Sequence, residues 1–288
     1  MLIANKWKEY ELLDAGNGDR LERWGHFTLR RPDPQIIWPI QQEDEAWHQV
    51  DASYRRSSSG GGNWSYSKQL PDRWIVKYDN KLSFYIKPTN FKHTGLFPEQ
   101  AVNWDWIIDK IQGARRPIRV LNLFAYTGGA TVAAAYAGAS VCHVDASKGV
   151  VQWAKENIHC SGLSDTSVRY ITDDVFKFVQ REQRRGTQYD AIIMDPPSFG
   201  RGPQGEIWKL EENLYDFVQS CLSILSPTPL FFLINSYTTG ISSTVLKNIM
   251  SMTLSKTYSG TLTHGELGLP ITQSPLVLPC GIFGRWEA

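Results

Sequence analysis

From residue 119 onward, short apolar segments alternate with longer amphipathic ones, and this alternation limits the possible folds more than any other feature of the sequence. The short segments have the length of strands, and the longer ones place apolar side chains at helical spacing. Such alternation is typical of a parallel sheet with helices on both faces, which binds ligands beyond the carboxyl ends of its strands. We predict strands over 119–125, 140–145, 168–172, 189–194 and 230–235, helices over 129–137, 148–160, 175–184, 211–225 and 243–252, and a hairpin within 257–286.

The residues before about 92 have a different character, rich in turns and aromatic side chains, with six tryptophans before residue 100. A hairpin is predicted over 74–86, where apolar side chains alternate on both sides of Asp79-Asn80. The Ser/Gly-rich run at 57–62 is predicted to be a flexible loop, because no helical pattern follows it. We therefore expect a smaller β-rich N-terminal module at 1–92, filled by large aromatic side chains, and an α/β domain at 93–288.

Composition excludes several classes of protein. With 42% hydrophobic and 20% charged residues, the chain is expected to be globular, and it has no apolar run long enough to cross a membrane. Met1–Tyr10 lacks the apolar core of a signal peptide, so we expect a cytoplasmic protein. The four cysteines show no CxxC spacing and predict buried thiols rather than a metal site. With a net charge of +1, the chain as a whole is not basic in the way that nucleic-acid-binding domains usually are, although a local basic patch is compatible with this charge.

The first predicted strand leads into a loop with adjacent glycines at 128 and 129. Two glycines allow a sharp turn and let a ligand approach the amides that begin the next helix. The loop differs from the GxGxxG pattern that holds a dinucleotide pyrophosphate, and it offers no basic residue to a phosphate. It therefore indicates a ligand loop of another kind and disfavours a nicotinamide-dependent dehydrogenase.

Acidic residues follow the next two predicted strands. Asp145 ends the second strand, where a carboxylate can accept hydrogen bonds from both hydroxyls of a ribose. Asp173-Asp174 follows the third strand, where an acid can accept a hydrogen bond from an adenine amine while an apolar neighbour such as Val175 packs on the ring. Each acid alone is more typical of a helix cap, and Ser147 could cap the helix after Asp145 equally well. Together with the glycine loop, the two acids predict adenosine binding.

The fourth predicted strand ends in Asp195-Pro196-Pro197-Ser198-Phe199. The two prolines fix the backbone and remove two amide donors, so the carbonyl groups there can only accept hydrogen bonds. Asp195 and the Pro196 carbonyl can hold the N–H groups of a planar amine and direct its nitrogen lone pair at an electrophile, while Phe199 stacks on the ring. The alternative is a rigid turn that ends a strand.

These segments together resemble those of class I S-adenosylmethionine-dependent methyltransferases. More narrowly, the chain is similar to the bacterial 23S rRNA methyltransferase family that modifies cytosine C5 or guanine N2. The resemblance implies an α/β fold with a Rossmann-like, seven-stranded, mostly parallel sheet, and S-adenosylmethionine as the cofactor, without a metal. The segments that carry it occur in the family's order and spacing at 92–100, 122–129, 144–147, 173–176 and 195–199.

The resemblance also implies roles for individual residues. The segment around Phe97 and Gln100 would close over the cofactor from the amino-terminal side. The catalytic residues would be Asp195, Pro196, Pro197 and Phe199, with Asp195 and Pro196 facing the transferable methyl group. The implied cofactor-binding residues are Phe97, Gln100, Asn122, Phe124, Ala125, Thr127, Gly128, Gly129, Asp145, Ala146, Ser147, Asp174 and Val175.

The expected reaction is methyl transfer to a nucleobase amine rather than to cytosine C5. Methylation at C5 needs a cysteine thiolate that adds to C6, and the segment after the fifth predicted strand, 233–239, contains no cysteine. Transfer to an amine needs alignment and a neutral lone pair, to which Asn235 and Ser236 could contribute. We expect an RNA partner, either ribosomal RNA or its precursor particle, and no membrane; the oligomeric state is open.

Two alternatives to an RNA methyltransferase stay open. A methyltransferase of the same fold that acts on a protein side chain or a small molecule fits the near-neutral charge. A non-catalytic module that binds S-adenosylmethionine is the other, and the intact Asp195-Pro196-Pro197 segment argues against it. Arginine pairs such as Arg55-Arg56 could contact phosphates, although isolated pairs are usually solvated surface.

Overall fold

The computed structural model describes residues 1–41, 45–57, 61–202 and 204–288. The chain divides into two compact units. The larger unit comprises residues 1–2, 102–267 and 281–288, and the smaller unit comprises residues 3–101 and 268–280. The expected boundary between 92 and 93 stays a prediction.

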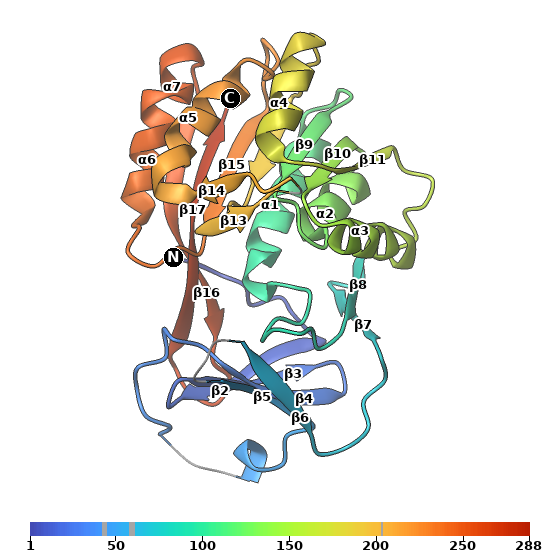
Figure 1. The fold of residues 1–288 in the computed structure, drawn as a ribbon, viewed down its shortest axis with the longest axis vertical. Coiled ribbons are helices and arrows are strands. Elements are labelled where there is room, and N and C mark those ends of the chain that lie inside the picture. The colour runs from blue at the N-terminus through green and yellow to red at the C-terminus, as the bar shows by residue number, and fades with distance from the viewer. Residues whose placement is uncertain (42–44, 58–60, 203) are drawn as a thin grey trace. The chain divides into compact units, whose positions relative to one another are not determined.

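The main sheet has eight strands among the described residues (Figure 1). β9, β10, β11, β12 and β15 are parallel, and β17 runs antiparallel to β15. The predicted α/β class with a mostly parallel sheet is confirmed, and the strand added to the expected seven is the two-residue β1. In spatial order the strands are β1 (Leu2–Ile3), β16 (Thr261–Pro270), β17 (Val277–Glu287), β15 (Phe231–Ser236), β12 (Ala191–Met194), β9 (Arg119–Leu123), β10 (Ser140–Asp145) and β11 (Val168–Thr172).

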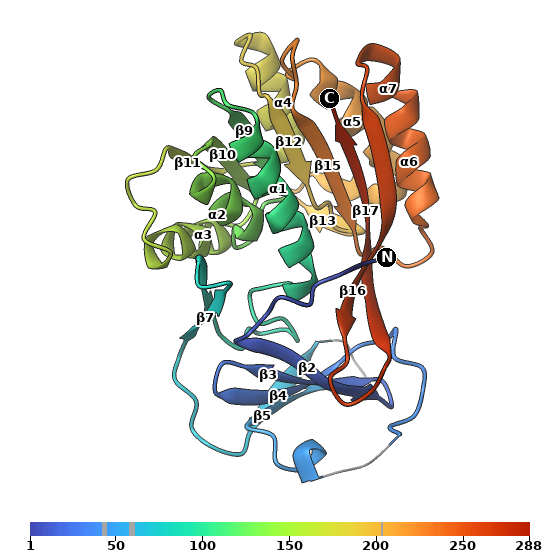
Figure 2. The same cartoon turned by 180° about the vertical axis from the view of Figure 1, so that it is seen from behind.

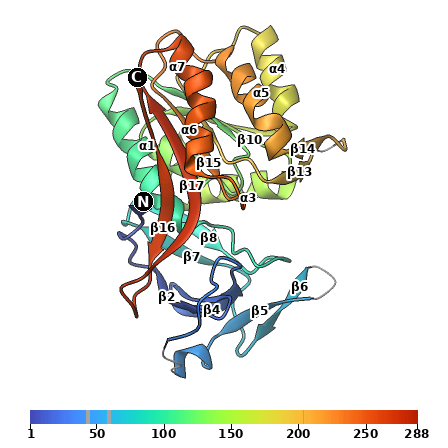
Figure 3. The same cartoon turned by 90° about the vertical axis from the view of Figure 1, so that its left-hand side faces the viewer.

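Helices cover both faces of this sheet. Successive side chains of a strand point to opposite faces, so a strand that is apolar throughout needs a helix layer on each side. Leu121, Leu123 and Met194 belong to a core that α4 to α7 complete on one face. On the other face Phe231 contacts Trp106 of α1, and α2 and α3 pack on β10. Figure 3 shows α1 and α6 on opposite sides of the sheet. The helices are α1 (Ala101–Gly113), α2 (Gly129–Tyr136), α3 (Lys148–Cys160), α4 (Val175–Arg184), α5 (Leu210–Leu222), α6 (Ser243–Met252) and α7 (Leu254–Thr257).

The smaller unit is β-rich, as predicted for the N-terminal module (Figure 2). Its hairpin β7–β8 turns at Asp79 and Asn80, whose φ angles of 48° and 53° suit the tight turn expected from the sequence. Residues 58–60 of the predicted Ser/Gly loop lie outside the described residues. The elements are the five-stranded sheet β2 (Tyr10–Gly16), β3 (Asp19–Trp24), β4 (Phe27–Pro32), β5 (Ala52–Arg56) and β6 (Gly62–Tyr66), the hairpin β7 (Trp74–Tyr78) and β8 (Leu82–Ile86), and the 3₁₀ helices η1 (Glu45–Trp47) and η2 (Pro98–Gln100).

The structure adds elements that the sequence prediction did not contain. Helix α1 buries Trp104, Ile107 and Ile111, whose spacing of three and four residues is a helical signal that the prediction left unused. The segment after β12, expected to be a loop, forms a hairpin of β13 (Phe199–Arg201) and β14 (Ile207–Lys209). Within the described residues, no helix is long and apolar enough to cross a membrane.

Candidate active site

The register of the parallel strands brings most of the predicted site residues to one edge of the sheet. Leu123, at the end of β9, pairs with Val144 of β10 and with Met194 of β12. The segments that follow these three strands therefore begin at the same level. Strand order reverses at β9, with β10 and β11 on one side and β12 and β15 on the other, and such a reversal is where open α/β sheets bind ligands.

The loop after β9 has an unusual backbone. Phe124, Tyr126 and Gly128 have φ angles of 52°, 49° and 84°, in the left-handed region that favours glycine. The amide of Asn157 on α3 donates to the carbonyl of Thr127 at 2.8 Å and holds the loop in this shape. Strain of this kind persists only where surrounding contacts enforce it, and it is common in ligand loops.

Close packing explains both glycines of this loop. A Cβ on Gly128 would lie 2.9 Å from the Cβ of Ala154, and one on Gly129 would lie 2.8 Å from the ring of Trp104. The glycines therefore let the loop lie against α3 and α1. Their contact with a cofactor stays a prediction.

Asp145 holds the neighbouring loops together at the end of β10. Its Oδ2 accepts the N–H of Tyr126 at 2.9 Å, and its Oδ1 accepts the N–H of Ser147 at 3.0 Å. Burial raises the pKa of the Asp145 carboxyl, and the N–H groups of Ser147, Tyr126 and Ala146 partly offset this. Ser147 occupies the N-cap position of α3, but its side chain makes no capping hydrogen bond.

Asn122 points to the α2 side of the sheet. Its side-chain amide donates to Thr131 Oγ1 at 2.9 Å, and that hydroxyl lies 2.9 Å from Nδ1 of His143. All three residues are buried, and burial lowers the pKa of His143 to about 4, so its ring is neutral at pH 7. Asn122 thus takes part in an internal network; a direct contact of its side chain with a cofactor stays a prediction.

Asp174 caps the helix that follows β11. Its Oδ1 accepts the N–H of Lys177 at 3.0 Å, which is the alternative function that the sequence allowed for this acid. Val175 is buried in the core below it. The predicted contact of Asp174 and Val175 with adenine stays a prediction.

The Asp195-Pro196-Pro197 segment is fixed by contacts on both sides. The indole N–H of Trp208 donates to the Pro197 carbonyl at 2.6 Å. The hydroxyl of Ser198 lies 2.7 Å from that of Thr238, in the loop after β15. The Pro196 carbonyl has no hydrogen-bond partner among the described residues. Phe199 begins β13 and is 53% exposed, so its ring is accessible to a substrate.

An aromatic cluster underlies these loops, and sequence reasoning missed most of it. The Trp208 ring centroid lies 4.9 Å from that of Phe124, 5.6 Å from that of Phe176 and 5.7 Å from that of Phe217. These rings come from the glycine loop, α4, α5 and the β13–β14 hairpin. Trp208 therefore packs on the glycine loop and on α4 while it holds the proline segment by a hydrogen bond.

Asn235, at the end of β15, is used internally. Its Oδ1 accepts the amide N–H of Asn103 at 2.8 Å, and Asn103 Oδ1 accepts the guanidinium of Arg285. Burial, opposed by Glu287, lowers the pKa of Arg285 to about 10. The interpretation of Asn235 as a substrate contact thus has a structural alternative, a buried network that joins α1, β15 and β17.

The remaining predicted residues belong to the smaller unit or carry no distinctive contact. Phe97 directly precedes the 3₁₀ helix η2 of the smaller unit, and Gln100 is the last residue of that helix and is buried. Ala125 and Ala146 lie in the loops after β9 and β10. Within the described residues, no group of three or more His, Cys, Asp or Glu side chains could hold a metal ion.

Comparison with known proteins identifies the family. A family model described as S-adenosylmethionine-dependent methyltransferase matches residues 28–219, two thirds of the chain. The chain belongs to the S-adenosylmethionine-dependent methyltransferase family. A solved S-adenosylmethionine-dependent methyltransferase from Agrobacterium tumefaciens is 38% identical and superimposes with a TM-score of 0.93, covering 99% of this chain and 92% of that one. The protein SMU.776, solved with SAH, shares the fold with a TM-score of 0.74 at 20% identity, over 98% of this chain and 76% of that one.

Curated relatives of this methyltransferase-family chain include ribosomal RNA methyltransferases. Ribosomal RNA large subunit methyltransferase K/L of Shewanella frigidimarina is 34% identical over 53% of this chain, a match that spans 21% of that protein. Ribosomal RNA large subunit methyltransferase K of Neisseria meningitidis is 25% identical over 81% of this chain and 67% of its own length. The match thus spans about a fifth of the first relative and two thirds of the second. The predicted cofactor, S-adenosylmethionine, is confirmed by the family.

Proposed function

We propose that this protein transfers a methyl group from S-adenosylmethionine to an amine of a nucleobase in ribosomal RNA. The observation that carries the proposal is the fixed Asp195-Pro196-Pro197 segment at the carboxyl end of β12. The Pro197 carbonyl accepts the indole N–H of Trp208, while the adjacent Pro196 carbonyl has no hydrogen-bond partner among the described residues. A carboxylate next to a rigid carbonyl acceptor suits an N–H donor group.

The residues present fit the cofactor. Asp145 Oδ2 accepts the N–H of Tyr126 and Oδ1 that of Ser147, and since a carboxylate has about four acceptor sites, it keeps lone pairs for the ribose hydroxyls. When bound, S-adenosylmethionine supplies an activated methyl group. The proposed roles of this chain's residues are binding and orientation: Asp145 holds the ribose, and Asp195 with the Pro196 carbonyl accepts the N–H groups of the amine. Accepting those bonds leaves the nitrogen lone pair free to react, and no strong base is required.

Three of the four cysteines are buried thiols, which supports nitrogen rather than C5 as the methyl acceptor. Burial raises the pKa of the Cys142 thiol to about 11 and also raises that of Cys221, so neither is poised as a thiolate. Cys280 lies in the smaller unit, and burial raises its pKa well above the usual value. A buried neutral thiol is a poor nucleophile.

The RNA substrate is proposed from the relatives, whose names describe ribosomal RNA methyltransferases. The proposal places the protein in the cytoplasm, with ribosomal RNA or its precursor particle as the partner. It is tested with tritiated S-adenosylmethionine and three pools from cells that lack the protein: total RNA, protein and small molecules. Label in ribosomal RNA, with nucleoside analysis showing an N-methylated base, would support it. Label confined to protein or small molecules would replace it with a methyltransferase of the same fold that acts on those substrates, and no label in any pool would favour the non-catalytic module.

Substitution of Asp195 tests the assigned chemistry. We expect Asp195→Ala to lower methyl transfer by orders of magnitude while the affinity for S-adenosylmethionine is preserved, because the carboxylate is proposed to hold the amine and not the cofactor. The exposed Asp165, between α3 and β11, provides Asp165→Ala as a control that should leave both quantities unchanged. Transfer that survives in Asp195→Ala would show that the target amine is placed wrongly.

A further inference from the structure

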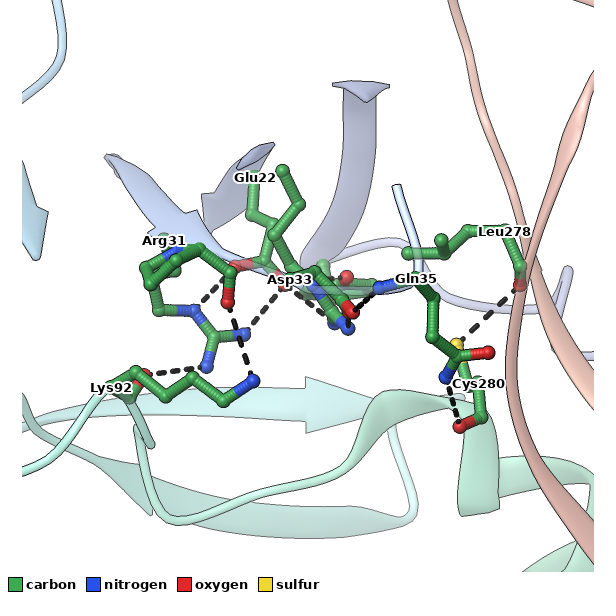
Figure 4. A network of polar contacts seen from close by, with 10 residues as sticks. Glu22, Arg31, Asp33, Gln35, Lys92, Leu278 and Cys280 are labelled. Carbon is green, nitrogen blue, oxygen red and sulfur yellow. Dashed lines mark hydrogen bonds and ion pairs between the residues drawn. The ribbon is translucent and has the colours of Figure 1, made fainter. Parts of the chain in front are cut away.

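The smaller unit contains a group of charges that methyl transfer does not use (Figure 4). Arg20 of β3 and Arg31 of β4 lie directly opposite each other, an arrangement that is unfavourable unless acids balance it. Buried Glu22 accepts two hydrogen bonds from Arg31, at 2.6 Å from Nε and 2.7 Å from Nη2, and Asp33 pairs with Arg20. Two carboxylates thus balance two guanidinium groups.

Lys92 and Arg56 add positive charge that these acids do not balance. The guanidinium of Arg31 donates to the Lys92 carbonyl at 2.8 Å, which places Lys92 beside the group, and Lys92 Nζ donates only a long bond of 3.3 Å to the Pro32 carbonyl. Burial lowers the pKa of Lys92 to about 8, together with the repulsion of Arg20, Arg31 and Arg56 and against the attraction of Asp33. Lys92 and Arg56 therefore add positive charge next to two guanidinium groups that Glu22 and Asp33 already balance.

Aromatic side chains border the unbalanced cations. The indole N–H of Trp64 donates to the carbonyls of Thr89 and Phe91, at 2.8 and 3.1 Å, and ties the segment before Lys92 to the edge strand β6. Phe91 is 63% exposed. Tyr66 is 54% exposed and lies on the same face of β6 as Trp64, two residues away.

Arg56 lies on this same side of the small sheet. It pairs with Gly62 in the β5–β6 ladder, in line with Trp64 two residues further along β6. Its guanidinium is exposed and makes no hydrogen bond or ion pair with the described residues. We call Arg56, Trp64, Tyr66, Phe91 and Lys92 the aromatic–basic face.

We propose that the aromatic–basic face binds a single-stranded segment of the RNA substrate. Exposed rings stack on unpaired bases, while neighbouring cations contact the phosphates, and this combination is how proteins hold single strands. A duplex would not present its base faces to Phe91 or Tyr66. The inference rests on the proposed function, which supplies RNA as the substrate.

The test measures binding of fluorescein-labelled RNA to the full chain by anisotropy, with a single strand of about 12 nucleotides and a duplex of the same length. Phe91→Ala should weaken single-strand binding about 5- to 100-fold, the usual effect of removing one stacking ring, and change duplex binding little. Arg56→Gln should lower the slope of log K against log salt by about 0.7 between about 50 and 200 mM. The control is Arg184→Gln, an exposed arginine at the C-terminal end of α4, which should alter neither quantity.

The outcomes separate this inference from the proposed function. Unchanged single-strand affinity in Phe91→Ala, or an unchanged salt slope in Arg56→Gln, would overturn the aromatic–basic face as the RNA contact. Equal losses on single strand and duplex would also overturn it, because stacking on unpaired bases would not then be the cause. Failure of the wild-type protein to methylate ribosomal RNA, with the single-strand effects intact, would overturn the proposed function alone. Affinity for SAH should be the same in all variants and confirms that each is folded.

Discussion

Asp145 allows a quantitative test of the cofactor site. Besides the backbone N–H groups of Tyr126 and Ser147, its two oxygens have lone pairs left for the two ribose hydroxyls. We take about 1.5–3 kcal/mol as the net loss when this charge-assisted pair is removed. Asp145→Ala should therefore raise the dissociation constant for SAH about 10- to 150-fold. Isothermal titration calorimetry measures this change directly, and Asp165→Ala serves as the control.

A ligand change separates ribose binding from damage to the loop. Asp145→Ala also removes the acceptor for the N–H groups of Tyr126 and Ser147, so part of any loss could come from a misshapen loop. The 2′,3′-dideoxy analogue of SAH lacks both hydroxyls, so the wild type and Asp145→Ala should bind it with similar affinity. An equal loss of affinity for SAH and for the dideoxy analogue would refute the assignment of Asp145 to the ribose.

The pH dependence follows from the raised pKa of Asp145. Burial makes this carboxyl take up a proton at a higher pH than a free aspartate, whose pKa is about 3.9. Protonation removes the charge that strengthens the bonds to ribose. Affinity for SAH should therefore fall as the pH is lowered from about 7 through the raised pKa, and this dependence should be absent in Asp145→Ala.

Two further changes test other parts of the structure. Glu22→Gln should destabilise the protein by about 3–5 kcal/mol, because it leaves buried guanidinium charge uncompensated. Glu11→Gln, in a half-exposed ion pair, should cost less than about 1 kcal/mol. Urea unfolding followed by tryptophan fluorescence compares the two free energies of unfolding. Equal costs would contradict the buried-charge argument. Trp208→Phe should lower kcat about 2- to 12-fold by removing the hydrogen bond to Pro197, with SAH affinity preserved, as measured by methyl transfer and calorimetry. Loss of affinity with normal kcat would show that Trp208 serves the cofactor loop instead.

Much of the fold could be predicted because its signals are local. The helix over 148–160 and the strand over 168–172 match the structure residue for residue, since the periodicity of apolar side chains is set by neighbours along the chain. The turn at Asp79-Asn80 could also be predicted from a local signal, because aspartate and asparagine tolerate positive φ. Parallel strands also imply that the segments after them meet at one edge, so the sequence alone predicts that Asp145 and Asp195 lie at the same edge.

The hairpin β13–β14 shows where local signals end. Its three-residue strands are too short for a periodic pattern, and Trp208 is significant only because it meets Phe124 and Phe176 from distant parts of the chain. The hydrogen bond from Asn122 to Thr131 likewise could not be predicted from local signals, because it depends on which face of the sheet α2 covers.

The sequence by itself determined the alternation of strands and helices, the edge at which a ligand would bind, and the residue types at each strand end, because each depends on a short stretch of chain. Only the tertiary structure decided which charges and rings lie together. Arg31 and Lys92 are 61 residues apart, and Asn103 and Arg285 are 182 apart, yet each pair is joined by a hydrogen bond. No periodicity encodes such contacts, because they arise from the packing of whole elements against one another.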